Sequence, residues 1–372
     1  MSVSSLRPTW AEIDLKKFKD NIRTVSRLAA GAGVLPVVKA NAYGIGAVPA
    51  SLAALTLPEV KGLAVATADE AMQIREAGID ALVLVLGPVT PEAMEVLVKN
   101  RVSFAVTSPA AVHAAQEVGG HGVKAKVHIK IETGMGRVGI VPGAELETAV
   151  RYLRGAAGVE VEGVFTHFSV ADTDREYTVL QMNAFDEALK QLAASGIRPT
   201  YRHAANSAAI LDFERAHLDL VRPGIMIYGS YPDPSLADKA VLKPVLFLLS
   251  RVSHVKRVPT GYAVGYGRTY VTSRPTTIVT IPAGYADGYP RLCSSQGSML
   301  LHGKRFPIAG RVCMDQIMLD VGDEGVEVGD LVTLIGIDGD ATITVDEVAA
   351  LSGTIAHEVL TGLTARVPRV YV

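Results

Sequence analysis

Eight short apolar runs, each followed by a helix-like or loop stretch, constrain the fold of this chain more than any other feature. The runs are rich in β-branched residues and cover residues 34–39, 62–67, 81–87, 102–108, 124–132, 161–169, 201–206 and 220–229. Between them, residues 68–78, 91–100 and 177–195 carry apolar side chains at the three-and-four spacing of amphipathic helices. Strands that alternate with helices form parallel sheets, and eight such units close a barrel. The sequence therefore predicts an α/β fold with an N-terminal (β/α)8 TIM barrel.

An open, doubly wound sheet is the competing interpretation of the same alternation. No G-x-G-x-x-G follows the first predicted strand, so a dinucleotide site has little support. Ahead of that strand, Asp14 is placed to cap a long amphipathic helix.

The pattern changes after about residue 238, where strands are broken by Gly and Pro. One helical stretch, TVDEVAALSG, interrupts these strands, and the terminal VPRVYV predicts a last strand. We expect two domains: a barrel over 11–237, and a mostly β domain over 238–372 that includes the segment 1–10.

Composition and charge argue against several classes of function. The chain has 36 Lys and Arg against 38 Asp and Glu, so it lacks the basic footprint of a nucleic-acid-binding protein. No apolar stretch approaches the roughly 18 residues that span a bilayer, and the N-terminus lacks a signal-peptide pattern. The only cysteines, Cys293 and Cys313, are too few for a disulfide framework and lack metal-ligand spacing. We expect a cytoplasmic enzyme with no metal site.

Lys39 closes the first predicted strand at the carboxyl end of the barrel, where catalytic groups of such folds lie. A partly desolvated lysine has a lowered pKa and can form a Schiff base, although a single strand-end lysine is more often a solvated cation. Later strand ends offer anion sites, with Ser207 at a helix start and the Gly224 and Ile225 amides near Arg222. Each feature alone is typical of caps and turns. Together they suggest pyridoxal 5'-phosphate.

The chain resembles the alanine racemase family in nine segments that follow one another in the same order. These segments are TWAEIDL, VVKANAYGIGA, HIKIETGMGRVGI, THFS, HAANSAAIL, RPGIMIYG, GYAVGYGRTY, PAGYADGYPR and GRVCMDQIMLD. The resemblance covers nearly the whole chain and implies a barrel that binds pyridoxal 5'-phosphate, followed by a β domain.

The resemblance implies a cofactor site in which Lys39 forms the covalent imine and Arg222 faces the pyridine nitrogen. A guanidinium does not hand over its proton, so that nitrogen stays unprotonated, which favours racemisation over transamination. The phosphate would be held by Tyr43, Ser207, Gly224 and Ile225.

Racemisation needs one base on each face of Cα, because a single face would regenerate the same enantiomer. The resemblance assigns one face to Lys39 and the opposite face to Tyr266, with His167 linking Tyr266 to Arg222. In the family the tyrosine comes from a second protomer, which implies a head-to-tail homodimer with two shared active sites.

The resemblance also assigns substrate contacts. Arg137 would assist the substrate carboxylate, and Lys130 matches a lysine that is often N-carboxylated to support that arginine. Without the modification the two would form a like-charge pair. We expect Cys313 to be a small buried neighbour of the pocket. The substrate entrance and pocket would be lined by Tyr285, Met314 and Asp315.

The chain departs from the family at Ala365, where many members carry a tyrosine whose hydroxyl reaches the phosphate. One lost hydrogen bond is worth roughly 1 kcal/mol. The absence of the tyrosine would loosen the cofactor or widen the pocket, and we therefore expect measurable turnover of serine.

The sequence thus predicts an isomerase that interconverts L- and D-alanine and supplies D-alanine for peptidoglycan. A broader racemase that also accepts serine is one alternative. A decarboxylase of basic amino acids would lack the context of Tyr266 and ETGMGR, and a non-catalytic protein that carries pyridoxal 5'-phosphate would consist of the barrel alone.

Overall fold

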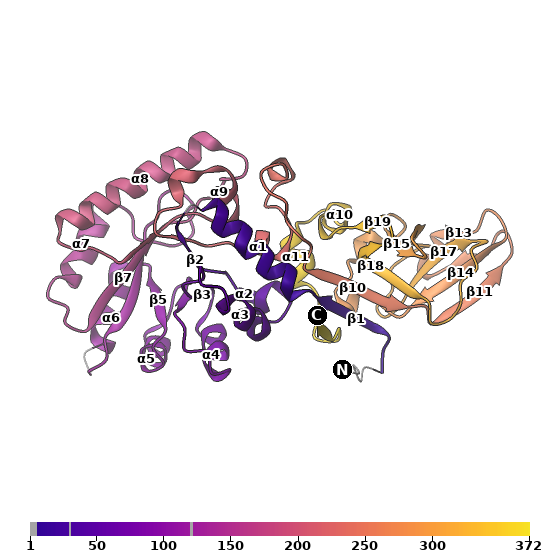
Figure 1. Cartoon of the computed structure of the whole chain (residues 1–372), viewed down its shortest axis with the longest axis horizontal. Helices are drawn as coiled ribbons and strands as arrows, with labels where there is room; N and C mark the ends of the chain where they lie inside the picture. The colour runs from indigo at the N-terminus through magenta and orange to yellow at the C-terminus, as the bar shows by residue number, and fades with distance from the viewer. Residues whose placement is uncertain (1–5, 30, 120–121) are drawn as a thin grey trace. The chain divides into compact units, whose positions relative to one another are not determined.

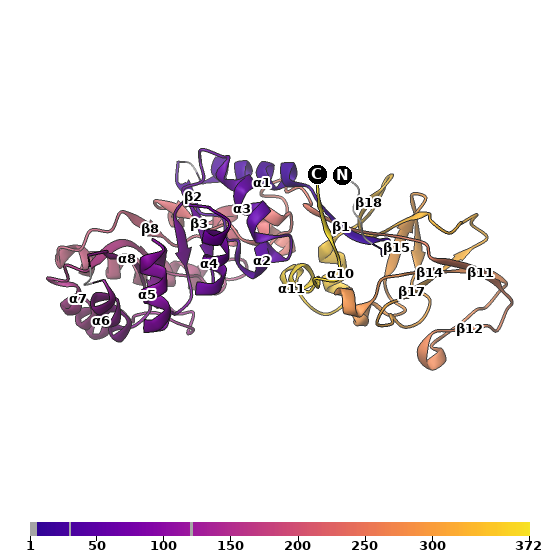
Figure 2. The same cartoon turned by 90° about the horizontal axis from the view of Figure 1, so that it is seen from below.

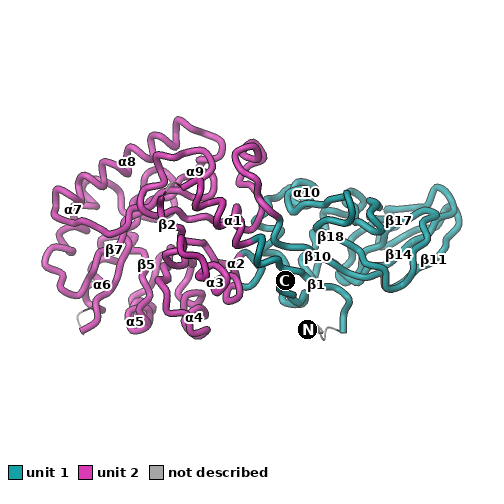
Figure 3. Tube along the Cα trace, in the orientation of Figure 1, with its two compact units in different colours: residues 1–17, 43–46, 244–372 teal, residues 18–42, 47–243 magenta. Residues whose placement is uncertain are grey.

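The computed structural model describes residues 6–29, 31–119 and 122–372, which form two compact units (Figure 3). Unit 2 consists of Phe18–Ala42 and Ala47–Lys243. Unit 1 contains the described residues up to Lys17, the short segment Tyr43–Gly46, and Pro244–Val372. No helix among the described residues is long and apolar enough to cross a membrane.

Unit 2 is built on eight short parallel strands. Six of them pair in chain order: β3 (Leu63–Val65), β4 (Val83–Val85), β5 (Ser103–Val106), β6 (Ala125–Lys130), β7 (Val159–Phe165) and β8 (Tyr201–His203). The other two, β2 (Gly33–Val34) and β9 (Leu220–Val221), pair with each other.

Backbone contacts join the pair to both ends of the six-stranded sheet. The bridge between Val37 and Ala64 connects the β2 segment to β3. The amide of Asp219 donates to the carbonyl of Arg202, which connects β9 to β8. The eight strands therefore complete a ring, and the predicted barrel is confirmed.

The helices of unit 2 surround these strands (Figure 1). They are α3 (Ala47–Leu55), α4 (Ala68–Glu76), α5 (Pro91–Lys99), α6 (Pro109–Val118), α7 (Ala144–Leu153), α8 (Arg175–Ala194) and α9 (Ser207–Asp212). On α8, Met182, Phe185 and Leu192 are buried on one face, at the spacing of an amphipathic helix. Ahead of the barrel, α1 (Leu15–Leu28) begins where Asp14 accepts a hydrogen bond from the Lys17 amide, which confirms the predicted cap.

The short element α2 (Lys39–Tyr43) is a left-handed turn. Ala40, Asn41 and Ala42 have φ of 50°, 54° and 51° with ψ of 50°, 46° and 55°. This conformation costs about 1–2 kcal/mol for each residue that carries a Cβ. Two contacts within unit 2 hold it: the Ala40 amide donates to Glu70 at 2.7 Å, and the Ala47 amide donates to Asn41 at 2.8 Å. The backbone is thus strained immediately after Lys39.

Unit 1 is mostly β, as predicted. Its larger sheet has the order β16 (Lys304–Pro307), β15 (Ser298–Leu301), β18 (Leu331–Asp338), β10 (Leu246–Arg251), β1 (Thr9–Ile13), β20 (Arg369–Tyr371), and β19 (Ala341–Ile343) pairs with β18. Smaller sheets contain β11 (His254–Val258), β14 (Thr276–Ile281) and β17 (Ile317–Gly322), and β12 (Ala263–Val264) with β13 (Tyr270–Val271). The helices are α10 (Val345–Leu351), which was predicted, and α11 (Ala356–Thr361).

β1 lies inside the larger sheet of unit 1 (Figure 2). Ala11 is opposite Leu248 of antiparallel β10 and opposite Arg369 of parallel β20. The alternation of buried and partly exposed residues along β1 fits a strand with one face on the core. The predicted terminal strand is therefore present, and its partner is the N-terminal strand.

Candidate active site

Lys39 lies beyond the carboxyl end of β2. The neighbouring segment after β9 runs beside it, because the Val37 amide donates to the carbonyl of Pro223 at 3.0 Å. Lys39 is partly buried, and burial lowers the pKa of its amine; the charge of Arg137 lowers the pKa further, against a small opposing effect of Glu70. A lowered pKa makes the neutral, nucleophilic amine more available.

Arg222 follows β9 and is buried, with 3% of its surface exposed. Its Nη2 donates to the carbonyls of Thr166 at 2.7 Å and Ala204 at 3.0 Å, and its Nη1 is 2.8 Å from Nδ1 of His203. Burial lowers the pKa of Arg222 to about 9, so the guanidinium stays protonated at neutral pH. The guanidinium is thus a fixed cation with a defined orientation.

His167 lies near four of the predicted residues of unit 2. Its Nδ1 is 3.5 Å from Nη2 of Arg222. Burial holds the pKa of His167 well below the ordinary value, and four cations lower that pKa further. The four are Arg222, Arg137, Lys130 and Lys39. The structure therefore brings together basic residues that lie far apart in the sequence.

Lys130 is buried at the end of β6, where its amine donates to the Ile131 carbonyl at 2.8 Å. Burial lowers the pKa of Lys130 to about 8. The loop that carries Arg137 is shaped by Glu132, whose carboxylate accepts backbone hydrogen bonds from residues 134–137. The sequence analysis missed Glu132, although an acid directly before a Gly-rich turn is a signal for such a cap.

The residues predicted to bind phosphate belong to different units. Within unit 2, the Gly224 amide donates to the Ser207 hydroxyl at 2.9 Å, which joins the start of α9 to the helical turn η2 (Ile225–Tyr228). Tyr43 belongs to unit 1, where its ring lies 5.7 Å from the ring of His357. Burial raises the pKa of Tyr43 to about 12, so its hydroxyl remains a hydrogen-bond donor at neutral pH.

Unit 1 contains a pocket of about 730 Å3 that includes four of the predicted residues, Tyr266, Tyr285, Met314 and Asp315. Tyr266 opens the turn η4 (Tyr266–Arg268), and 72% of its surface is exposed. The pocket is also lined by residues that the sequence analysis did not single out: Arg291, Arg311, Val312 and Gln316.

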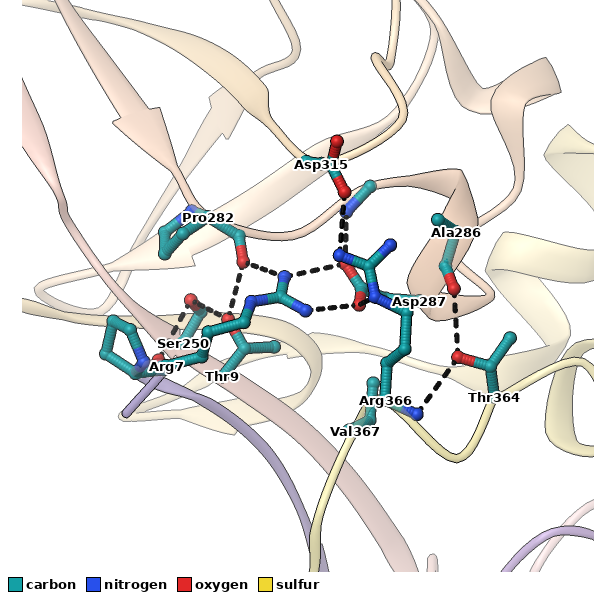
Figure 4. A network of polar contacts seen from close by, with 12 residues as sticks. Arg7, Thr9, Ser250, Pro282, Ala286, Asp287, Asp315, Thr364, Arg366 and Val367 are labelled. Carbon is teal, nitrogen blue, oxygen red and sulfur yellow. Dashed lines mark hydrogen bonds and ion pairs between the residues drawn. The ribbon is translucent and has the colours of Figure 1, made fainter. Parts of the chain in front are cut away.

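An ion-pair network supports this pocket (Figure 4). Asp287 ends the turn η5 (Tyr285–Asp287) and accepts two hydrogen bonds from Arg7, at 2.7 and 2.9 Å. Burial raises the pKa of Asp287, but the hydrogen bond from Arg7 and that from the Gly284 amide outweigh it, so the pKa is lowered overall. Arg366 lies 3.6 Å from Asp287 and donates to Asp315 at 2.7 Å, which connects the two carboxylates at the pocket.

Our expectation that Cys313 is buried was wrong: the residue is partly exposed and lines the pocket. The contact that fixes it is made by the backbone, because the Tyr285 amide donates to the Cys313 carbonyl at 3.1 Å. A Cβ at Gly284 would lie 2.3 Å from that carbonyl oxygen. The loop therefore packs against Gly284 through its main chain, which leaves the Cys313 side chain at the pocket wall.

Comparison with known proteins gives matches over almost the full chain. Residues 13–232 match the family described as alanine racemase, N-terminal domain, and residues 245–371 match its C-terminal domain. An alanine racemase from Carboxydothermus hydrogenoformans is 49% identical over 99% of this chain and 100% of its own length. The crystal structure of alanine racemase from Bacillus anthracis with bound L-Ala-P has a TM-score of 0.93 at 39% identity, covering 100% of this chain and 96% of that one. The structure from Streptomyces coelicolor A3(2) has a TM-score of 0.94 at 37% identity, covering 99% and 98%.

Proposed function

Because this chain belongs to the alanine racemase family, we propose that it binds pyridoxal 5'-phosphate at the residues around His167 and uses Lys39 and Tyr266 as its two bases. The enzyme is an isomerase that acts on alanine. The observation that carries the cofactor proposal is the buried guanidinium of Arg222, 3.5 Å from His167, with Lys39, Lys130 and Arg137 near enough to lower the pKa of that histidine. Such a region suits a doubly anionic phosphate ester and a substrate carboxylate.

The donor set fits this cofactor. Lys39 offers an amine with a lowered pKa to its carbonyl. The Gly224 amide donates to the Ser207 oxygen, which leaves the Ser207 hydroxyl proton to donate beside the start of η2 at Ile225. The described hydrogen bonds of Arg222 use Nη1 and Nη2, so its Nε–H is left to donate to a ring nitrogen.

Proton transfer at Cα is the part of the reaction that this chain's own residues perform. When bound, pyridoxal 5'-phosphate supplies a carbonyl that condenses with amines and a ring that accepts electron density from Cα. Lys39 takes or returns the proton on one face, and Tyr266 does so on the other. Arg222 donates a hydrogen bond without giving up its proton, which favours return of the proton to Cα.

Arg137 orients the substrate carboxylate, and Lys130 supports it. Because the pKa of Lys130 is about 8, part of its amine is neutral near neutral pH. A neutral amine adds to carbon dioxide and releases a proton, which gives a carbamate. Its negative charge would turn the repulsion between Lys130 and Arg137 into an ion pair.

We further propose that the chain works as a head-to-tail homodimer in the cytoplasm. In that assembly, Tyr266 of one protomer serves the site of Lys39 in the other, and Tyr285, Met314 and Asp315 line the entrance from the same side. The D-alanine that it makes supplies peptidoglycan synthesis.

A chiral exchange assay tests the two-base proposal. Purified protein with added pyridoxal 5'-phosphate is incubated with L-alanine in deuterated water, and both enantiomers and their Cα deuterium are followed. We expect deuterated D-alanine. If only L-alanine gains deuterium, one base alone is working and the role of Tyr266 is refuted; if nothing exchanges, the catalytic proposal fails.

A further inference from the structure

A line of hydrogen-bonded side chains leads from Arg222 into the barrel. Nη1 of Arg222 lies 2.8 Å from Nδ1 of His203, and Nε2 of His203 lies 2.8 Å from Nδ1 of His128. Nε2 of His128 then lies 3.2 Å from Oε2 of Glu162. Both histidines are fully buried, and Glu162 is 6% exposed. The proposed mechanism uses Arg222 but none of the other three.

This hydrogen-bonded line ends near the amino ends of the barrel strands, whereas Lys39 lies beyond their carboxyl ends. Oε2 of Glu162 accepts from the Ser103 hydroxyl at 2.5 Å, and Oε1 accepts from the Lys126 amine at 3.1 Å. Ser103 is the first residue of β5 and Lys126 the second of β6, so both lie at the amino ends of their strands. Ser103, Lys126 and Glu162 line an open pocket of about 560 Å3. Arg222, by contrast, follows the carboxyl end of β9.

The two ends of the line fix every proton between them. Burial lowers the pKa of both histidines, so each ring is neutral and has one donor and one acceptor. Arg222 can only donate, so Nδ1 of His203 must accept and its Nε2 must carry the proton. His128 must then accept at Nδ1 and donate from Nε2, and the Glu162 carboxylate can only accept. One arrangement of protons satisfies the whole line.

We propose that Glu162 is a positioning residue for Arg222, acting through His128 and His203 from the far end of the barrel. Among the described contacts, Arg222 has no carboxylate partner, and Glu162 is the acid at the end of its hydrogen-bonded line. If the histidines reversed their protons, an N–H of His203 would face an N–H of Arg222. The guanidinium would then turn away from the direction in which it meets the ring nitrogen, a role that rests on the proposed function.

The backbone of Gly163 packs tightly against the ring of His128. A Cβ at Gly163 would lie 2.2 Å from Nδ1 of His128 and 2.4 Å from its Cε1. Gly163 is opposite His128 in the pairing of β6 with β7, where the register shifts between Val127 and His128. Only glycine leaves room for the ring at this position.

The Glu162→Gln variant tests the proposal without changing the size of the side chain. Lys126 can only donate, so it holds the amide oxygen on its own side and turns the NH2 group toward Nε2 of His128. That nitrogen must now accept, which moves the proton to Nδ1 in both histidines. We expect 15N spectra of the full chain labelled at histidine to show Nε2–H at His128 and His203 in the wild type and Nδ1–H in the variant, before the cofactor is added. With cofactor, we expect kcat to fall roughly 10- to 100-fold with little change in KM.

A rescue separates positioning from a general loss of structure. In the Glu162→Gln/Lys126→Met double variant the amide is free to turn its oxygen toward His128, so Nε2–H and most of kcat should return. Glu160→Gln is the matched control, because Glu160 also lies on β7 and also pairs with Lys126. Glu160 is exposed, however, and its carboxylate oxygen lies 3.9 Å from the Lys126 amine, beyond hydrogen-bond distance. It should leave the histidine spectra and kcat unchanged.

The outcomes are distinct. Wild-type histidine spectra or wild-type kcat in the Glu162→Gln variant would overturn the proposal, as would a double variant that recovers neither. If Glu162→Gln does not fold, Gly163→Ala displaces the His128 ring with no change of charge, and an unchanged kcat in that variant also overturns it. A wild type with the expected spectra but no racemisation would instead refute the proposed function.

Discussion

Among single residues, Lys39 is the one whose replacement should change the absorption spectrum most directly. Its amine is the nucleophile that we assign to the cofactor carbonyl, and its lowered pKa favours that reaction. The Lys39→Ala variant should lose the imine absorption band after dialysis. Lys61→Ala, at an exposed barrel lysine, is the control and should keep the band. A band that persists in Lys39→Ala would mean that another lysine holds the cofactor.

Tyr266→Phe should retain the cofactor and lose most racemisation, because it removes only the hydroxyl that we assign to the second face of Cα. Absorption spectra measure the first property, and the deuterium assay measures the second. Tyr262→Phe changes another exposed tyrosine four residues earlier and should behave as the wild type. Unchanged racemisation in Tyr266→Phe would remove this residue from its role.

Ala365 is the residue that we expect to affect the choice between alanine and serine as substrates. It is exposed and precedes Arg366, whose guanidinium binds Asp315 at the pocket of unit 1. A small residue at this position predicts measurable turnover of serine beside alanine. Ala365→Tyr should lower kcat/KM for serine relative to alanine, by about fivefold if the hydroxyl contributes roughly 1 kcal/mol. A wild type with fast alanine turnover and none of serine would contradict the wider pocket.

At the scale of elements, the sequence predicted the barrel well because several of its strands, such as β3, β4 and β5, are apolar runs buried on both faces. It predicted less well where a backbone conformation has no residue signature. Of the predicted strand 34–39, only Val34 belongs to the regular strand β2 (Gly33–Val34). Val37 adds an isolated bridge to Ala64, and the chain then enters the left-handed turn after Lys39. Ala40 and Ala42 give no sign of that conformation, since only Asn41 is of a type enriched there.

The same limit applies to the polar line inside the barrel. His128, Glu162 and His203 come from three different strands, and a lone histidine or glutamate in a strand gives no indication of its partner. The site residues were predicted through the motifs that they occupy, such as ETGMGR and HAANSAAIL, rather than through their contacts. Arg7 lies outside these motifs, and its contact with Asp287 of PAGYADGYPR became visible only in the structure.

The left-handed turn predicts that a change from alanine to glycine will stabilise the protein. Ala40 is exposed with φ of 50°, so Ala40→Gly relieves backbone strain and leaves no cavity. We expect the free energy of unfolding to rise by about 0.5–1 kcal/mol, measured by chemical denaturation. Ala184→Gly, inside the right-handed helix α8, should lower it by about 1 kcal/mol. Equal losses in both variants would show that the turn is not strained in solution.

At the scale of the whole molecule, the proposed dimer makes a quantitative prediction. Lys39→Ala and Tyr266→Phe should each be nearly inactive alone. If Tyr266 serves the partner's site, each mixed dimer holds one complete site, and a fully exchanged equal mixture should recover about one quarter of wild-type activity. If both residues of a site came from one chain, mixing would recover nothing. Size-exclusion chromatography of the mixture is the control that shows whether the subunits exchange.

The position of β1 between β10 and β20 has a consequence for biosynthesis. The barrel of unit 2 lies within Phe18–Lys243, so a ribosome has translated all of it before any of β10 or β20 exists. Translation proceeds at about 5–20 residues per second, and domains fold as they emerge. β1 therefore waits through the synthesis of the whole barrel with both edges unpaired, and unpaired edges invite wrong strand pairing. The strand made earliest is among the last to find its neighbours, so the nascent chain is most vulnerable to misassembly at β1.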